Sequence, residues 1–206
     1  DFSRTPDPGS AAVIDNSRAH SGTRSIKVST SNAMAPHFIF KALPSNITNI
    51  YVRAWVYSPA QLGGGSPGSA GDHAHIIGTL QTPGSDEGQE LRFGPVQRSY
   101  LGGFAPKPGD AFTKAQPNVF IPANTWTCVE WAVEDTANFD RMYAWVGNQS
   151  VFAAESANDW QNSISADFAK INSYISFGWR QFGSVANIRD IWFDDIAVGT
   201  SRIGCN

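Results

Sequence analysis

Hydrophobic and polar side chains alternate along residues 51–57, and this period of two predicts a β-strand with two unlike faces. One face is apolar and suited to a core: Val52, Ala54 and Val56. The other face carries large rings and a guanidinium: Tyr51, Arg53, Trp55 and Tyr57. Aromatic faces beside hydrogen-bonding groups suit sugar rings, which present C–H patches and a rim of hydroxyls. The pattern predicts either a ligand-binding face or a second small core under a long loop.

Similar short runs recur along the whole chain, separated by turn-rich pieces such as 62–71, 82–88 and 102–110. The runs with strand character are 25–29, 37–40, 51–57, 74–80, 90–94, 128–133, 141–146, 174–179 and 190–198. One short helix is the best helical candidate, at 163–170. Many short strands with Gly and Pro between them are typical of an all-β sandwich. We expect a jelly roll of two antiparallel sheets with a concave groove, formed by a single domain over residues 1–206.

Three further runs repeat the two-faced pattern of 51–57. His73 and His75 share one side of their run, and Glu90 and Arg92 share one side of the next. The third run places its polar and aromatic side chains on one face: Arg141, Tyr143 and Trp145. In a sandwich, we expect all four faces to line the concave side of one sheet. This expectation favours a shared ligand groove over a buried aromatic layer.

Composition narrows the classes of partner. The 206 residues are 41% hydrophobic and 12% aromatic, which is enough to build a core. Charged residues make up only 16%, with a formal net charge of -3, which argues against a nucleic-acid partner because such binding needs a basic face. Apolar runs are far shorter than the roughly 18 residues of a membrane-spanning segment. We expect a monomer with neither a nucleic-acid nor a membrane partner.

Two cysteines, Cys128 and Cys205, bear on the cellular compartment. Two unpaired thiols are possible, but a bridge between them would close a loop of about 77 residues and stabilise the fold by about 4 kcal/mol. A disulfide implies an oxidising compartment, and therefore secretion. Asn46 and Asn148 begin triplets that match the N-glycosylation pattern. The chain starts at Asp1 without Met, and we interpret it as a mature or trimmed form.

Short motifs spread over most of the chain resemble a known family. Two of them, at 20–28 and 191–198, are similar to segments of jelly-roll carbohydrate-binding modules and lyase-like sandwiches. More specific motifs lie at 51–55, 91–92, 177–179 and 200–205. In this order they resemble the core domain of the fungal cellulose-induced proteins and their bacterial relatives. The resemblance implies a β-jelly roll with a calcium ion, similar to glucuronan and alginate lyases.

The resemblance also implies which residues hold the calcium. Asp194 matches the family's carboxylate, and Ser21 and the carbonyl of Arg24 match its turn. Where the family has a Glu near its N-terminus, this chain has Ser3, and Asp1 would have to compensate. Calcium prefers six to eight oxygen ligands. Alternatively, Asp194 and Asp195 flank a strand and only accept hydrogen bonds from a turn.

Cleavage of a uronate polymer by β-elimination needs a cation, a base and an acid. Arg92 is the candidate that would neutralise the sugar carboxylate, on both the resemblance and its strand parity. His73 or His75 could be the base, Tyr100 the acid, and Gln97 an amide partner. The family's histidine two residues before this arginine is Glu90 here. Arg180 stands where relatives can carry an acid, which would suit an anionic sugar.

Other chemistries fit less well. A hydrolase would need facing carboxylates, for which Glu90 with Glu130 or Asp110 could be proposed. His73 and His75 resemble a metal-binding pair, but a third ligand is missing from the pattern. We therefore expect a secreted polysaccharide-active protein, either a lyase-like enzyme or a non-catalytic binding or accessory module that uses the same groove. A structural surface domain without a sugar ligand is the third hypothesis.

Overall fold

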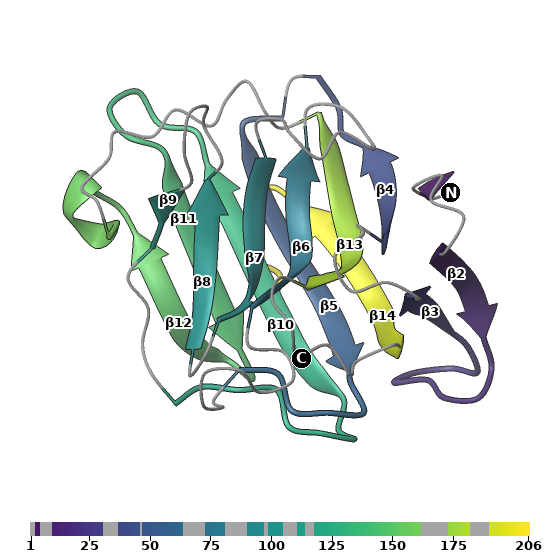
Figure 1. Ribbon diagram of the computed structural model, residues 1–206. Helices are drawn as coiled ribbons and strands as arrows, with labels where there is room; N and C mark the ends of the chain where they lie inside the picture. The colour runs from purple at the N-terminus through teal and green to yellow at the C-terminus, as the bar shows by residue number, and fades with distance from the viewer. Residues whose placement is uncertain are drawn as a thin grey trace.

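The computed structural model shows two β-sheets packed face to face (Figure 1). It describes residues 3–4, 10–30, 37–45, 47–63, 73–80, 90–96, 99–104, 111–113, 118–161, 173–181 and 190–206. All pairings between its strands are antiparallel. The predicted all-β sandwich is confirmed. No helix within these ranges is long and apolar enough to cross a membrane.

Each sheet has seven strands. In spatial order, the first sheet is β1 (Ser3–Arg4), β4 (His37–Ala42), β13 (Tyr174–Gln181), β6 (Ala74–Leu80), β7 (Glu90–Val96), β8 (Ser99–Phe104) and β9 (Ala111–Phe112). The second is β12 (Gln149–Ala154), β11 (Arg141–Val146), β10 (Thr127–Glu134), β5 (Asn49–Tyr57), β14 (Asp190–Gly199), β3 (Ser25–Thr30) and β2 (Ser10–Asp15). A short 3-10 helix at Ala157–Asp159 follows β12.

The core fills the space between the two sheets. From the second sheet it receives the apolar face of β5 (Val52, Ala54 and Val56), as the alternation predicts. Phe177 of the first sheet meets Phe193 of the second with ring centroids 6.0 Å apart. Each large side chain removed from water in this way stabilises the fold by about 1.5–3 kcal/mol. The core thus fixes which face of every central strand points outward.

All nine strands predicted from the sequence are present, with ends that differ by at most two residues. Five strands were not predicted: β1, β2, β8, β9 and β12. β8 includes Gly102 and Gly103, and glycines are typical of turns rather than strands. The predicted helix at 163–170 lies outside the described residues.

The prediction of one groove shared by four aromatic or polar strand faces is wrong. β5 and β11 belong to the second sheet, whereas β6 and β7 belong to the first. Because the inner faces of both sheets meet in one core, the outer faces point in opposite directions (Figure 1). Alternation identifies the outer face of a strand, but the sheet to which the strand belongs depends on long-range pairing. The candidate residues therefore divide into two separate sites.

Candidate functional site

The outer face of the first sheet brings together five of the predicted residues: His73, His75, Glu90, Arg92 and Arg180. We call this group the histidine–arginine patch. It lies on three adjacent strands, β13, β6 and β7, with His73 directly before β6. Arg180 on β13 lies directly opposite His75 on β6, and Arg92 on β7 lies opposite Gly78 of β6. The His73 and His75 rings meet edge to face, with centroids 5.5 Å apart.

An irregularity in β6 directs His75 outward. Ile76 and Ile77 are consecutive, yet both are buried in the core. The pairing of β6 with β13 shifts its register between Phe177 and Arg180. Such a bulge places two successive side chains on one face and changes the facing of the residues before it. His75 consequently lies on the outer face beside Arg180, although Ile77 faces the core.

Glycine 94 allows β6 and β7 to approach closely beside this histidine. A Cβ atom at Gly94 would lie 1.9 Å from the Ala74 carbonyl oxygen and 2.9 Å from the His75 Cα. Any larger residue would overlap the backbone of β6. The close approach keeps the backbone beneath His75 and Arg92 in a fixed position, which is a requirement for a preorganised site.

Burial and positive charge control the protonation of His75. The residue is only 7% exposed. Burial lowers its pKa well below 6.5, and the positive charges of Arg92, His73 and Arg180 lower it further. His75 is therefore a neutral imidazole at pH 7, able to accept a proton. Arg92, whose side chain is 13% exposed, forms an ion pair with Glu90.

This arrangement places two cationic side chains close to a proton acceptor. The guanidiniums of Arg92 and Arg180 can bind a carboxylate through paired hydrogen bonds. The neutral His75 can accept a proton from a bound molecule. Of the other predicted catalytic residues, Tyr100 belongs to β8 opposite Pro95, but its side chain is outside the described part. Gln97 also lies outside the described residues.

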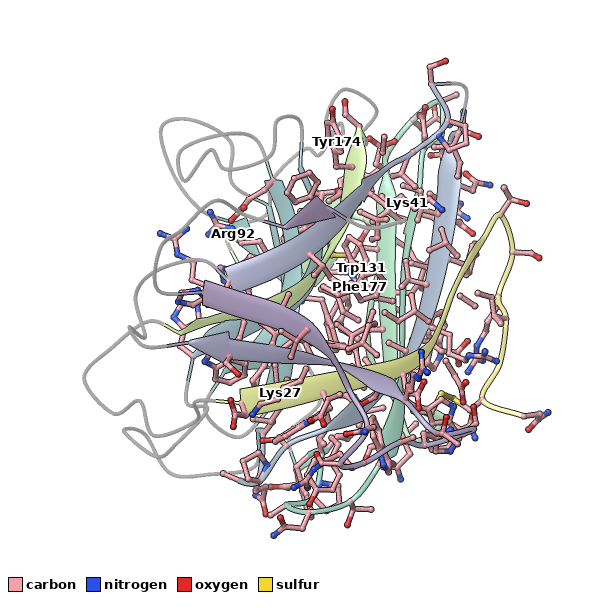
Figure 2. The ribbon with its side chains drawn as sticks, turned by 90° about the vertical axis from the view of Figure 1, so that its right-hand side faces the viewer. Lys27, Lys41, Arg92, Trp131, Tyr174 and Phe177 are labelled. Carbon is pink, nitrogen blue, oxygen red and sulfur yellow. A yellow bond between two sulfur atoms is a disulfide. The ribbon has the colours of Figure 1, made fainter. Side chains whose placement is uncertain are left out.

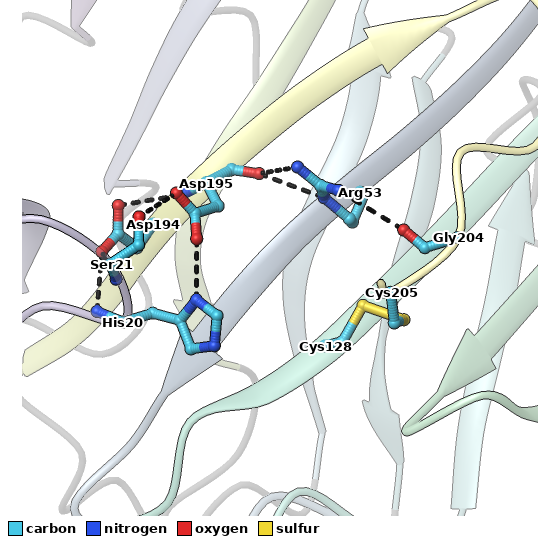
Figure 3. Close-up of polar contacts among 8 residues, drawn as sticks. All are labelled: His20, Ser21, Arg53, Cys128, Asp194, Asp195, Gly204 and Cys205. Carbon is cyan, nitrogen blue, oxygen red and sulfur yellow. Dashed lines mark hydrogen bonds and ion pairs between the residues drawn. A yellow bond between two sulfur atoms is a disulfide. The ribbon is translucent and has the colours of Figure 1, made fainter.

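The outer face of β5 contacts protein instead of forming an open floor. The His20 ring stacks on Trp55. Arg53 donates hydrogen bonds to the carbonyl oxygens of Asp195 and Gly204 (Figure 3). Beside them, the Arg18 guanidinium lies over the Tyr57 ring, 4.4 Å from its centroid. Tyr51 donates a hydrogen bond to Glu134. This is the second of the two sequence interpretations, a layer of side chains covered by other segments.

The C-terminal segment supplies much of that cover. The predicted disulfide is confirmed: Cys205 is bonded to Cys128 on β10 (Figure 3). Glu130, two residues along β10, is 1% exposed and accepts hydrogen bonds from the Arg202 side chain and the Gly204 backbone N–H. Arg202 also lies over the Trp145 ring, 4.2 Å from its centroid. Trp145 stacks on Tyr143, whose hydroxyl donates to Glu155.

Sequence reasoning missed the role of Glu130 as the acceptor that holds this segment. The signal was available, because Glu130 shares the outer face of its strand with Cys128. A chain that returns to Cys128 must pass over the same face. Buried carboxylates are stable only where hydrogen-bond donors surround them, and here Arg202 and Gly204 are the donors. Glu130 is thereby a structural residue.

The turn expected to bind calcium is held together by hydrogen bonds (Figure 3). Asp194 Oδ2 accepts from the backbone N–H groups of His20 and Ser21, at 2.7 and 3.2 Å. Asp195 accepts from the Ser21 hydroxyl at 2.6 Å and contacts His20 Nδ1 at 2.7 Å. These hydrogen bonds, Ser21 first, lower the pKa of Asp195.

These contacts allow a test of the fit to calcium. Arg24, Asp194 and Asp195 line one pocket of about 280 Å³. Asp194 has N–H donors on both oxygens, since Oδ1 accepts from the Asp195 N–H. The two carboxylates fall short of the six to eight oxygens that calcium prefers, and no group of three or more His, Cys, Asp or Glu residues suited to a metal occurs among the described residues. Asp1 and the Ser3 side chain lie outside them, so the calcium site stays a prediction.

Comparisons with solved structures agree with the fold. The chain is similar to "Cellulose induced protein, Cip1", with a TM-score of 0.69 and 21% identity, over 100% of this chain and 94% of that one. It also resembles a botulinum neurotoxin type C structure whose title concerns two ganglioside molecules, with a TM-score of 0.57 and 8% identity over 99% of this chain and 44% of that one. A carbohydrate esterase from Shiga toxin-encoding bacteriophage phi24B has a TM-score of 0.52 and 9% identity, over 96% and 88% of the two chains. At these identities the likeness shows the fold alone.

The sequence itself identifies the family. No curated protein sequence matches the chain significantly. In contrast, the family described as "Polysacc_lyase-like: Cip1-like, core domain" matches residues 3–201, which is nearly the whole chain. This match confirms the resemblance found in the short motifs and supports a carbohydrate-active protein. The chain belongs to the polysaccharide lyase-like family of Cip1-like core domains.

Proposed function

We propose that the protein cleaves an acidic polysaccharide by β-elimination at the histidine–arginine patch. The observation that carries this proposal is a buried imidazole, His75, which lies opposite Arg180 and near Arg92, so that its burial and their charges lower its pKa. Membership in a polysaccharide lyase-like family gives the carbohydrate context. The disulfide supports the accompanying proposal that the protein is secreted.

In the proposed reaction, Arg92 and Arg180 bind the carboxylate of a uronate residue. Their charge stabilises the negative charge that develops when the neighbouring carbon loses its proton. His75 takes that proton on an imidazole nitrogen. The electron pair of the broken C–H bond forms a carbon–carbon double bond, and the bond to the leaving sugar oxygen breaks. That oxygen gains a proton from water or from an acidic group on the same face of the sheet.

Glu90 tunes the patch in this mechanism. Its carboxylate pairs with Arg92, so a substrate carboxylate has to compete with it for the guanidinium. Competition of this kind favours substrates with several neighbouring anionic groups, because each additional contact offsets the displaced ion pair. An anionic polymer satisfies this condition better than a neutral one. Arg180 adds positive charge to the patch beyond that of Arg92.

A panel of glucuronan, alginate and pectin tests the proposal, with ultraviolet absorbance of the unsaturated product as the readout. We expect absorbance to rise with at least one polymer, and His75→Gln and Arg92→Ala to lower the rate by 100-fold or more. Arg141→Ala is the matched control, because Arg141 lies on β11 of the other sheet. Full activity of Arg92→Ala would refute the assignment of this face.

The second candidate function is a non-catalytic binding module that uses the same patch. Its supporting observation is the Arg92–Glu90 pair, since two fixed charges on a sheet can recognise a polar polymer without chemistry. Affinity electrophoresis with the same polymers distinguishes the two. Retardation that Arg92→Ala abolishes, without any absorbance gain on the panel, would favour binding over cleavage.

A further inference from the structure

A pocket of about 580 Å³ opens at one edge of the sandwich, away from the histidine–arginine patch. Its walls come from both sheets, with Leu43 after β4, Ile175 of β13, and Ile196 and Val198 of β14. Ile47 and Lys41 also line the pocket. Figure 2 views the molecule from the side and labels Lys41. The volume lies within the range of about 300–1,000 Å³ that is usual for small-molecule sites.

The pairing of the strands explains why the sandwich is open at this edge. β3 pairs with β14 only over Asp190–Phe193, and beyond that point β14 pairs with β5 alone among the described strands. The register of β14 shifts between Asp194 and Ala197, where Asp195 has a φ of 45°. On the other sheet, β1 pairs with Phe40 and Ile39 and leaves Lys41 beyond its end. The last residues of β4 and β14 therefore border a gap at the edge of the core that no described strand covers.

The lining is mostly aliphatic and carries one charged side chain, Lys41. Ile175 is buried, whereas Val198 is 41% exposed, so a large apolar side chain reaches solvent at the mouth. Apolar surface exposed around a concave site is typical of a binding site for an apolar group. Lys41 is the one charged residue of the lining, and the structure gives it no ion-pair partner among the described residues.

We propose that this pocket binds an amphiphilic carboxylic acid, with the hydrocarbon chain among the aliphatic side chains and the carboxylate at Lys41. Charge complementarity selects this class, because a lone ammonium at the rim of an aliphatic pocket attracts an anion and carries no specificity for a hydroxyl-rich ligand. A sugar chain does not suit the pocket, because its described lining has no aromatic side chain and few of the hydrogen-bonding groups that sugars need. The site does not rest on the function proposed above.

Calorimetry with dodecanoate, below its micelle concentration, tests the site, with dodecanol as the uncharged probe. We expect saturable binding of one dodecanoate per chain, and weaker binding of dodecanol. Lys41→Met keeps the apolar stem and should weaken dodecanoate about tenfold while leaving dodecanol unchanged. Equal affinity of dodecanoate for wild type and Lys41→Met would overturn the role of the ammonium.

A second pair of variants tests the location. Val198→Trp places a large ring at the exposed mouth of the pocket and should abolish dodecanoate binding, with little effect on folding. Val13→Trp is the matched control, because Val13 is 46% exposed on β2 and does not line the pocket. Loss of binding in both variants, retention in both, or absence of saturable binding to wild type would each refute the proposal.

Discussion

The imidazole of His20 lies flat on the indole of Trp55, with ring centroids 3.6 Å apart and ring planes 12° from parallel. The same imidazole contacts Asp195 on β14. One side chain thus connects the loop before β3 to two central strands of the second sheet. This contact also places protein on the ring that gave the 51–57 strand its sugar-binding appearance.

His20→Ala is expected to destabilise the protein by about 1–2 kcal/mol. The estimate adds the energy of a stacked ring pair to that of a hydrogen bond with a carboxylate. We lower the sum because the side chains of His20 and Asp195 are both partly exposed. Urea unfolding measures the loss, and a red shift of tryptophan fluorescence would report the uncovered Trp55. Thr23→Ala, an exposed position in the same loop, is the control. Equal stability of His20→Ala and wild type would contradict the structural role of the stack.

Arg202→Ala should cost more stability than Arg141→Ala. Arg202 is hydrogen-bonded to Glu130, which is almost fully buried, and its removal leaves that carboxylate with fewer donors. We expect a loss of about 2–4 kcal/mol, toward the lower part of the range for a broken buried pair because Arg202 is itself partly exposed. Arg141 pairs with Glu134 at 3.8 Å near the surface, so its removal should cost at most about 1 kcal/mol. Urea unfolding of both variants under non-reducing conditions makes the comparison, and equal losses would refute it.

Acidification below pH 6.5 should destabilise the protein partly through His75. Its pKa is lowered in the folded state, so between the two pKa values the unfolded chain binds the additional proton. Stability therefore rises with pH in this window and is lost as pH falls below 6.5. Thermal unfolding between pH 4.5 and 7.5 should show a shallower slope for His75→Gln than for wild type. His20→Gln is the histidine control, and parallel slopes for wild type and His75→Gln would contradict the assignment.

Gly94→Ala is expected to destabilise the protein by about 1–3 kcal/mol. The new methyl group would overlap the Ala74 carbonyl oxygen, and the two strands would have to separate. Gly199→Ala tests the specificity of the effect, since a Cβ there has its nearest neighbour at 3.6 Å. Differential scanning calorimetry should find a large decrease in Tm for the first variant and a small change for the second. The prediction fails if the two variants melt together.

Calcium is expected to raise the melting temperature through the Asp194 turn. A ligand that binds only the folded chain adds about 2.7 kcal/mol at 100 times its dissociation constant. Chelator should therefore lower Tm, and excess calcium should restore it. Asp194→Asn should remove the response, whereas Asp159→Asn, on the distant 3-10 helix, should retain it. An identical Tm in chelator and in calcium would count against the site.

The strands were predictable from sequence because period-two alternation is a local property, and it located β5, β6 and β11 to within two residues. The division of these strands between two sheets was not predictable, because it depends on long-range pairings such as that of Arg53 on β5 with Glu130 on β10. The residues of the histidine–arginine patch lie on or beside adjacent strands, but their role in a reaction stays a prediction. The bulge at Ile76 and Ile77, which gives His75 its orientation, has no sequence signal beyond two consecutive isoleucines.

The disulfide between Cys128 and Cys205 determines from which side of the sandwich the C-terminal segment leaves. It fixes the last residues on the outer face of the second sheet, opposite the histidine–arginine patch. Any tether, label or solid support joined after Asn206 therefore leaves from the back of the sandwich. Molecules immobilised in this way would present His75 and Arg92 outward, in one common orientation, to a polymer in solution.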